Sequence, residues 1–256
     1  MSDHVAEHVS VTRQGAVLVL QLARPEKKNA LTVAMYAALA DALASAASEY
    51  GVRAVLVTGS GDAFTSGNDL HDFVAQPPTG PDSPVFRFLT ALAGFPKPIV
   101  AAVNGLAIGI GTTMLLHCDL VVADDSARFQ LPFINLGLVP EAASSLLLPK
   151  LVGHRVAAEL LLLGTPFDAR RAAELGIVNK VAEQGGALRE ATAWAVQLTE
   201  KAPTALAKAK RLLLAPDRGV AARMQDEAGD FIAQLSGPEF AEAVAAFREK
   251  RAPRFG

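Results

Sequence analysis

The chain has 256 residues, of which 51% are hydrophobic, and its formal net charge at pH 7 is −2. A chain of this size can bury one substantial core, and its weak negative charge gives no reason to expect a nucleic acid partner. The single cysteine, Cys118, excludes an intrachain disulfide and fits a reducing compartment.

Membrane segments and export signals are not expected in this sequence. Residues 1–10 lack a basic start followed by an apolar core. The apolar stretch 99–116 is interrupted by Asn104, Gly105, Gly109 and Gly111, so it does not form an unbroken span of about 20 residues. We therefore expect a cytoplasmic protein without a membrane partner.

The first part of the chain alternates strand-like and helical segments. Strand-like runs at 5–11 and 16–22, joined by a short connection with glycine, predict a hairpin. Thr32 then precedes a helix over 33–50 that Gly51 ends. Further strands are expected at 54–58, 99–103, 120–123 and 176–181, and helices at 84–93 and 111–117. This alternation predicts parallel pairing and an α/β fold.

The last part of the chain is almost entirely helical in pattern. Helices are expected at 188–199, 203–214, 220–235 and 238–251, with Pro, Gly or Asp between them. We predict one main body over residues 1–200 and a helical C-terminal region over residues 201–256.

Two glycine-rich loops, 59–70 and 104–111, each follow a predicted strand and lead into a predicted helix. Backbone N–H groups at such helix starts have no partner within the helix, and two of them can stabilise negative charge on one carbonyl oxygen. Two other interpretations exist. The first loop is also a plain turn in which Asp69 caps a helix. The second is two thirds of a dinucleotide fingerprint, but Met114 occupies the third glycine position.

Several longer motifs occur in a fixed order. They are Arg24-Pro25-Glu26-Lys27-Lys28-Asn29-Ala30-Leu31, Ala63-Phe64-Thr65-Ser66-Gly67-Asn68-Asp69-Leu70, Lys97-Pro98 and Ala101-Ala102-Val103-Asn104-Gly105. Together they resemble the signature runs of the crotonase superfamily, also called enoyl-CoA hydratase/isomerase. The similarity extends from the N-terminal hairpin to about Val181 and returns at 247–251.

The resemblance implies a fold and an assembly. It implies an α/β spiral of ββα units, followed by a helical C-terminal region that mediates the contacts of a homotrimer or a dimer of trimers. It also implies an acyl-CoA thioester substrate, whose carbonyl is held by two backbone N–H groups that match Ser66 and Ile110. Coenzyme A is then part of the substrate, and no separate cofactor is expected.

Further site positions follow from the same resemblance. The expected contacts to coenzyme A are Lys27, Lys28, Ala30, Asn68, Asp69 and Leu70, with Phe247 and Lys250 reaching the coenzyme A of a neighbouring subunit. The expected acyl pocket includes Thr113, Phe133 and Leu136. Each set has an ordinary alternative, since exposed lysines confer solubility and Phe247 and Lys250 also suit the end of an amphipathic helix. We expect no metal site, because the histidines lack partners.

The expected reaction depends on two missing acids. The hydratase branch uses two glutamates, and the matching positions here are Thr113 and Phe133, neither of which can transfer a proton as a carboxyl does. Residues 132–145 instead resemble the peroxisomal type of Δ3,Δ2-enoyl-CoA isomerase. In that type the glutamate of a Pro-Glu pair is the base, which corresponds to Glu141.

We therefore expect a Δ3,Δ2-enoyl-CoA isomerase in which Glu141 moves a proton between two carbons. The alternatives are an enoyl-CoA hydratase and an acyl-CoA-binding pseudoenzyme without catalysis. Local sequence alone also allows Glu141 to be an ordinary acid in the first turn of a helix. If Glu141 faces an apolar pocket, its pKa should lie above the ordinary glutamate value of about 4.3.

Overall fold

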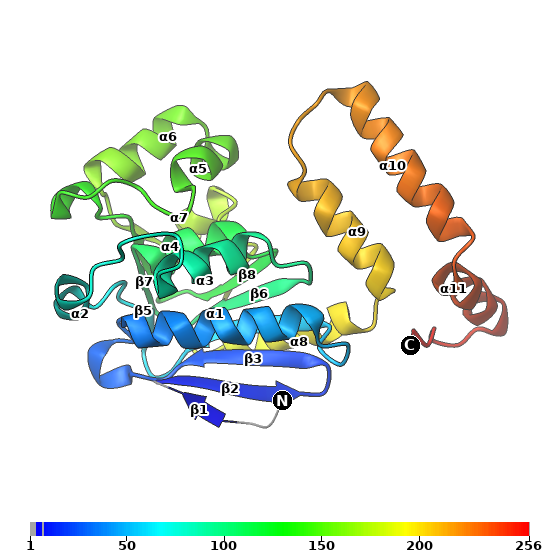
Figure 1. The fold of residues 1–256 in the computed structure, drawn as a ribbon, viewed down its shortest axis with the longest axis horizontal. Coiled ribbons are helices and arrows are strands. Elements are labelled where there is room, and N and C mark those ends of the chain that lie inside the picture. The colour runs from blue at the N-terminus through cyan, green and yellow to red at the C-terminus, as the bar shows by residue number, and fades with distance from the viewer. Residues whose placement is uncertain (1–3, 7, 256) are drawn as a thin grey trace.

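Two β-sheets organise the part of the chain that the computed structural model describes, residues 4–6 and 8–255 (Figure 1). The larger sheet has seven strands in the order β1-β2-β3-β4-β6-β8-β11, and the smaller has four in the order β10-β9-β7-β5. The larger sheet contains β1 His4–Ala6, β2 Val9–Gln14, β3 Val17–Leu22, β4 Ala54–Gly59, β6 Ile99–Val103, β8 Leu120–Asp124 and β11 Lys180–Ala182. The smaller contains β5 Ala63–Thr65, β7 Leu106–Ile108, β9 Arg128–Gln130 and β10 Phe167–Asp168.

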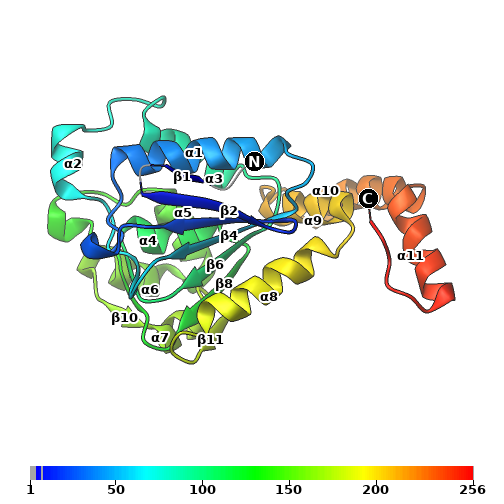
Figure 2. The same cartoon turned by 90° about the horizontal axis from the view of Figure 1, so that it is seen from below.

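The strands from β3 to β11 of the large sheet are parallel, as the sequence predicts. Every residue of β4 and β6 is buried, because helices cover both faces (Figure 2). Val55 and Val57 face the core shared with α1 Val33–Ser48 and α3 Pro84–Ala93, whereas Leu56 faces α8 Ala187–Thr199. Continuous apolar strands of this kind are typical of parallel sheets.

Consecutive strands alternate between the two sheets. β4, β6 and β8 enter the large sheet, and β5, β7 and β9 after them enter the small one before the chain turns into helices. This repeat is the predicted spiral of ββα units. The remaining helices of this part are α2 Leu70–Ala75, α4 Ile110–Thr113, α5 Ser144–Val152, α6 His154–Ala158 and α7 Ala169–Glu174. Short helical turns lie at η1 Pro25–Lys27, η2 Met114–His117, η3 Ile134–Leu136 and η4 Glu159–Leu163.

The N-terminal strands differ from the prediction. The run 5–11 is not one strand, because β1 ends at Ala6 and β2 begins at Val9, with His8 between them at a positive φ of 64°. Residue 7 and residues 1–3 lie outside the described residues. The hairpin turn is also later than predicted, since β2 continues to Gln14, which pairs with Val17.

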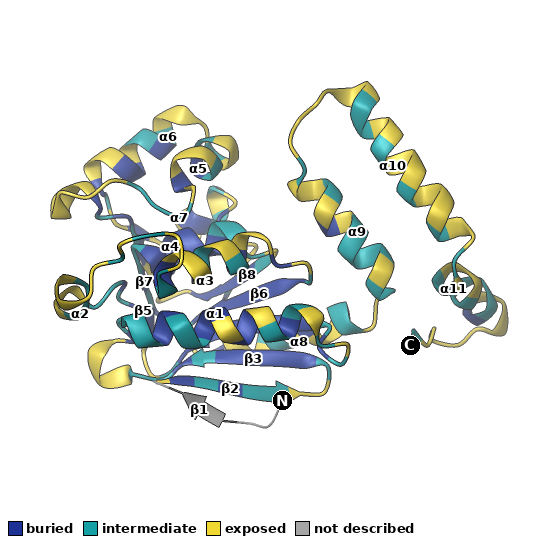
Figure 3. Cartoon of the chain, viewed as in Figure 1, coloured by how far each residue is buried: buried dark blue, intermediate teal, exposed yellow. Residues whose placement is uncertain are grey.

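The C-terminal helices form an arm that extends from the body of the fold (Figure 1). They are α9 Pro203–Leu214, α10 Val220–Leu235 and α11 Pro238–Glu249. Most of the arm is exposed or half-buried (Figure 3). The predicted boundary near residue 200 falls between α8 and α9, and the arm's role in oligomerisation stays a prediction.

One buried side chain fastens the arm to the body. Lys210 of α9 donates hydrogen bonds to Asp119 Oδ2 and to the Lys97 carbonyl, both at 2.8 Å. The same Asp119 oxygen accepts from the Ile99 amide, at the start of β6. The start of the arm is therefore joined to the end of the central sheet. Within the described residues, no helix is long and apolar enough to cross a membrane.

Candidate active site

Two loops leave the small sheet at the same edge. The loop after β5 leads through Asn68 into α2, and the loop after β7 turns at Gly109 into α4. Each loop begins at the carboxyl end of its strand. Since β5 and β7 are parallel neighbours, these two ends lie at the same edge of the sheet. They also touch: a Cβ on Gly111 would lie 2.7 Å from Thr65 Cγ2. The two predicted glycine-rich loops are thus brought together.

The amide expected at Ser66 is already engaged. Ser66 N–H donates to the Lys28 carbonyl at 2.9 Å, so it is not a free donor and the expectation for this residue was wrong. The position of Ser66 in the glycine-rich loop did not show that the carbonyl of Lys28, the residue after η1, would accept its hydrogen bond. The prediction chose the wrong residue of the loop, because the amide without an acceptor belongs to Asn68, two residues later.

Asn68 carries the amide that the loop leaves free. Leu31 N–H donates to the Gly67 carbonyl, and Asp69 N–H donates to the Leu31 carbonyl, each at 2.8 Å. Successive N–H groups of an extended segment point to opposite sides, so the Asn68 N–H faces away from Leu31. Within the described chain it has no acceptor among the backbone and side-chain hydrogen bonds.

Ile110 supplies the second amide. It is the first residue of α4, and an amide in that position has no partner inside its own helix. Gly109 turns the chain into α4 with φ 57° and ψ −116°, a conformation that favours glycine. Its carbonyl accepts from the amides of Thr112 and Thr113. The expected Ile110 donor stays a prediction that this geometry permits.

Glu141 lies beside the helical segment that begins at Ile110. The Thr113 hydroxyl donates to Glu141 Oε1 at 2.5 Å. Burial raises the pKa of Glu141 above its ordinary value, and the Thr113 hydrogen bond opposes part of that rise. The expected direction of this pKa shift is confirmed. In the described part of the chain, no second carboxylate contributes to it.

The backbone after Glu141 has an unusual conformation. Ala142 and Ala143 both have positive φ, 52° and 53°, which is strained for residues with a Cβ. His117 Nε2 lies 2.8 Å from the Ala142 carbonyl, and Ser144 Oγ donates to the Glu141 carbonyl at 2.7 Å. Glu141 precedes α5, which begins at Ser144, so the alternative that it occupies the first turn of a helix is wrong.

Tyr36 is a polar neighbour that the sequence analysis missed. This residue of α1 is fully buried, and its hydroxyl donates to Asn68 Oδ1 at 2.5 Å. Its ring centroid lies 6.2 Å from that of Phe73 and 5.6 Å from that of Phe88. Burial, and then the negative charge of Glu141, raise the pKa of Tyr36. In sequence, Tyr36 has only the apolar periodicity of a core position as a signal.

The turn around η1 packs against the first loop and brings most of the expected coenzyme A residues together. Lys27 and Lys28 are exposed, and Lys28 Nζ lies 2.6 Å from Asp62 Oδ2. The Ala30 carbonyl accepts from Arg24. Leu70, at the start of α2, is half exposed. Their role in binding coenzyme A stays a prediction.

The Asp69 carboxylate has structural partners. It caps α2 by accepting the amides of His71 and Asp72, and Arg24 Nη1 lies 2.7 Å from its second oxygen. The hydrogen bond from Arg24 lowers the pKa of Asp69. The cap predicted for this residue is confirmed, and its carboxylate is thereby occupied with holding the loop.

The remaining expected residues divide between the site and the arm. Phe133 is buried and Leu136 is half exposed, both at η3 in the segment before Glu141. Phe247 and Lys250 lie at the end of α11 in the arm, and α11 lies far from α2 in both views (Figures 1 and 2). Within this chain the fold does not bring those two residues to the loops.

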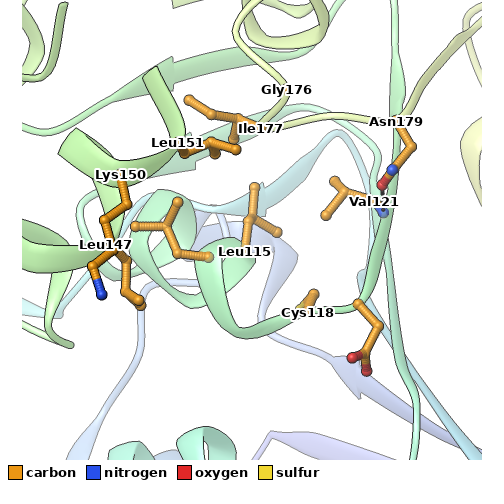
Figure 4. Close-up of a pocket in the computed structure, with 11 residues that line it drawn as sticks. Leu115, Cys118, Val121, Leu147, Lys150, Leu151, Gly176, Ile177 and Asn179 are labelled. Atoms are coloured by element: carbon orange, nitrogen blue, oxygen red, sulfur yellow. Dashed lines mark hydrogen bonds between the residues drawn. The ribbon is translucent and has the colours of Figure 1, made fainter. Parts of the chain in front are cut away.

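A separate pocket of about 340 Å³ lies between η2, β8 and α5. Leu115, Leu147 and Leu151 line it, with Cys118 at one side (Figure 4). Burial raises the pKa of Cys118 to about 12, so its thiol stays protonated at neutral pH. This pocket contains none of the expected site residues. Over the residues described, no group of three or more acid, histidine or cysteine side chains is placed to hold a metal ion.

Comparisons with known proteins agree with this geometry. A family model described as enoyl-CoA hydratase/isomerase matches residues 12–256. The chain is 34% identical over 247 residues to the 2,3-dehydroadipyl-CoA hydratase of Escherichia coli (strain K12), covering 96% of this chain and 97% of that protein. It is 41% identical over 179 residues to enoyl-CoA delta isomerase 2 of Rattus norvegicus, covering 68% of this chain and 46% of that protein.

A solved structure extends the agreement to the whole fold. The crystal structure of an enoyl-CoA hydratase/isomerase from Pseudoalteromonas atlantica T6c is 47% identical and has a TM-score of 0.79. The comparison covers 98% of this chain and 100% of that chain.

The alternation of strands between two sheets, with paired loops at one edge, defines a crotonase-like fold. The chain belongs to the enoyl-CoA hydratase/isomerase family. It is accordingly an enzyme of the crotonase type that acts on coenzyme A thioesters. Its relatives include a hydratase and an isomerase, so family membership does not choose the reaction.

Proposed function

We propose that the protein is a Δ3,Δ2-enoyl-CoA isomerase that uses Glu141 as its single acid and base. The observation that carries the proposal is the position of the Glu141 carboxylate, hydrogen-bonded to Thr113 one helical turn from the Ile110 amide. The aligned positions of the hydratase glutamates hold Thr113 and Phe133. Thr113 thus assists the one carboxylate instead of supplying a second.

The proposed reaction moves one proton. Glu141 removes a proton from C2 of a 3-enoyl-CoA, and the electron pair spreads over the double bond and the thioester carbonyl as a dienolate. The amides of Asn68 and Ile110 hydrogen-bond the oxygen on which charge develops. Glu141, now protonated, returns the proton to C4, which leaves a conjugated 2-enoyl-CoA and the original carboxylate.

The raised pKa of Glu141 supports this role. A base that must take a proton from carbon and then give it back works best when its pKa lies nearer the operating pH. Burial moves the pKa of Glu141 in that direction. Water addition would need a second group to protonate C2 while the first activates water, and the described hydrogen bonds show no second carboxylate at Glu141.

The binding site is proposed to follow the family pattern. The η1 turn with Lys27, Lys28 and Ala30, and the loop with Asn68 and Leu70, would hold coenzyme A, and Phe133 and Leu136 would contact the acyl chain. Phe247 and Lys250 would complete the site of a neighbouring subunit in a homotrimer, which is consistent with their exposed position on the arm.

The test supplies the purified protein with a 3-enoyl-CoA and, separately, with a 2-enoyl-CoA, and follows the absorbance of the conjugated thioester. A rise with the first substrate and a steady signal with the second are expected. Rapid loss of absorbance from the 2-enoyl substrate would identify a hydratase and refute the one-base reaction. Binding of both thioesters without turnover would identify a pseudoenzyme.

A further inference from the structure

The helical segment formed by α4 and η2 contacts the Glu141 region at two separate points. Thr113, the last residue of α4, donates its hydroxyl hydrogen to Glu141 Oε1. His117, the last residue of η2, places Nε2 2.8 Å from the carbonyl of Ala142, the residue directly after the glutamate. The first contact holds the carboxylate, and the second holds its backbone.

The contact between His117 and the Ala142 carbonyl stabilises a strained turn. Ala142 and Ala143 are both in the left-handed region, which is strained for a residue with a Cβ. Such a conformation persists only where surrounding contacts over-determine it. His117 provides one contact and Ser144 Oγ another, since the latter donates to the Glu141 carbonyl. Together they fix where the Glu141 side chain begins.

The side-chain contact selects one oxygen. The Thr113 hydrogen bond occupies Oε1 of Glu141, which leaves Oε2 to exchange a proton with substrate. Thr113 is fully buried, and the hydroxyl cannot turn to solvent for another partner. The same segment begins at Ile110, whose amide is a proposed oxyanion donor. Base and oxyanion donor are therefore held by one short segment of backbone.

We propose that Thr113 and His117 are positioning residues that fix the Glu141 carboxylate relative to the Ile110 amide. This inference rests on the proposed function, because it assigns roles relative to the base of that reaction. Neither side chain exchanges a proton with substrate. Thr113 aims the reactive oxygen, and His117 holds the strained turn from which the glutamate projects.

The test for Thr113 compares isosteric and conservative variants. Thr113→Val removes the hydroxyl at nearly constant volume and is expected to lower kcat about tenfold with little change in KM, since misplaced catalytic groups act mainly on the chemical step. Its pH profile should shift to higher pH, because the hydrogen bond that lowers the pKa of Glu141 is gone. The neighbouring titratable groups are Tyr36 and His117. Thr113→Ser should restore both kcat and the profile.

A matched control separates positioning from loss of a buried hydroxyl. Thr112 is also buried, and its hydroxyl donates to the Ala107 carbonyl instead of to Glu141. Thr112→Val should lower the melting temperature without moving the pH profile. If Thr113→Val does not fold, Thr113→Ala replaces it. Wild-type kcat and pH profile in a folded hydroxyl-free variant would overturn the role of Thr113.

His117 is tested through its hydrogen bond. His117→Ala should lower kcat, and His117→Gln, whose amide can still donate to the Ala142 carbonyl, should recover part of it. Equal kcat in His117→Ala and wild type would overturn the role of His117. Failure of the proposed function gives a different result, namely no isomerisation by wild type, or full activity in Glu141→Gln.

Discussion

The Tyr36 hydroxyl donates a hydrogen bond to the side-chain oxygen of Asn68, the residue whose amide is the proposed first oxyanion donor. Tyr36 belongs to α1 and Asn68 to the loop after β5, so this contact joins a packed helix to the loop of the proposed donor. The aromatic rings of Phe73 and Phe88 surround the tyrosine. This rigid core side chain supports the loop in addition to the backbone hydrogen bonds with Leu31 and the ion pair between Arg24 and Asp69.

Tyr36→Phe should lower both the rate of catalysis and the stability of the fold. The variant keeps the ring in its place and removes one hydrogen bond, which contributes about 1 kcal/mol and corresponds to about a fivefold change in rate. We expect kcat to fall about fivefold, because the Asn68 amide is less well held. Steady-state kinetics with a 3-enoyl-CoA and thermal unfolding measure the two effects. Tyr50→Phe, at an exposed tyrosine, is the matched control and should change neither.

Gly111→Ala should separate the two loops that carry the proposed oxyanion donors. The added Cβ would lie 2.7 Å from Thr65 Cγ2 and 3.1 Å from the Thr65 carbonyl, so the loops must move apart. A displacement of this kind can cost on the order of a hundredfold in rate. We expect a large fall in kcat. Gly80→Ala introduces its methyl into open space and is expected to leave kcat unchanged. Equal activity in the two variants would show that the loop spacing is unimportant.

The sequence predicted the parallel sheet because its strands are buried on both faces. Runs such as Ile99–Val103 are then continuously apolar and easily recognised. The raised pKa of Glu141 was also expected in advance, from the resemblance of the Pro140-Glu141 segment to the isomerase type. These features depend on neighbours in sequence or on the burial of whole elements.

The parts that were missed depend on contacts between distant segments. Whether the Ser66 or the Asn68 amide is free depends on which carbonyl of the η1 turn reaches the loop, and that turn lies almost 40 residues earlier. Tyr36 could be placed beside Asn68 only when α1 was seen to pack behind the loop. The break at His8 likewise follows from β1 folding back on β2.

Lys210→Met should loosen the arm from the body. The substitution removes the ammonium that bonds to Asp119 and to the Lys97 carbonyl, and it leaves a partly buried carboxylate without its cation. Breaking a buried pair costs about 3–5 kcal/mol, and about 2 kcal/mol is expected here because Asp119 is partly exposed to solvent. The checks are thermal unfolding and the rate of proteolysis between α8 and α9.

The control for the arm is Lys208→Met. Lys208 lies on the same helix, but its Nζ is 3.6 Å from Oδ1 of Asp230, a residue of α10 in the arm itself. Its substitution should leave the proteolysis between α8 and α9 at the wild-type rate. Equal cleavage of the Lys210 and Lys208 variants would mean that the arm is fastened by other contacts.

Glu141→Gln should abolish isomerisation and at the same time change how stability depends on pH. Loss of a general base lowers the rate by about 10²–10⁴-fold.

Because burial raises the pKa of Glu141 in the folded state, the folded wild type binds a proton more tightly than the unfolded chain does. Its stability therefore falls as pH rises from the ordinary glutamate pKa through the raised pKa. Glutamine has no proton to lose, so the variant should gain stability relative to wild type across that window. Thermal unfolding of both proteins at a series of pH values measures the difference, which should be largest at neutral pH and shrink in acid. A constant difference at all pH values would mean that the Glu141 carboxylate is not destabilised by burial, and the raised kinetic pKa expected for the isomerase would lose its physical cause.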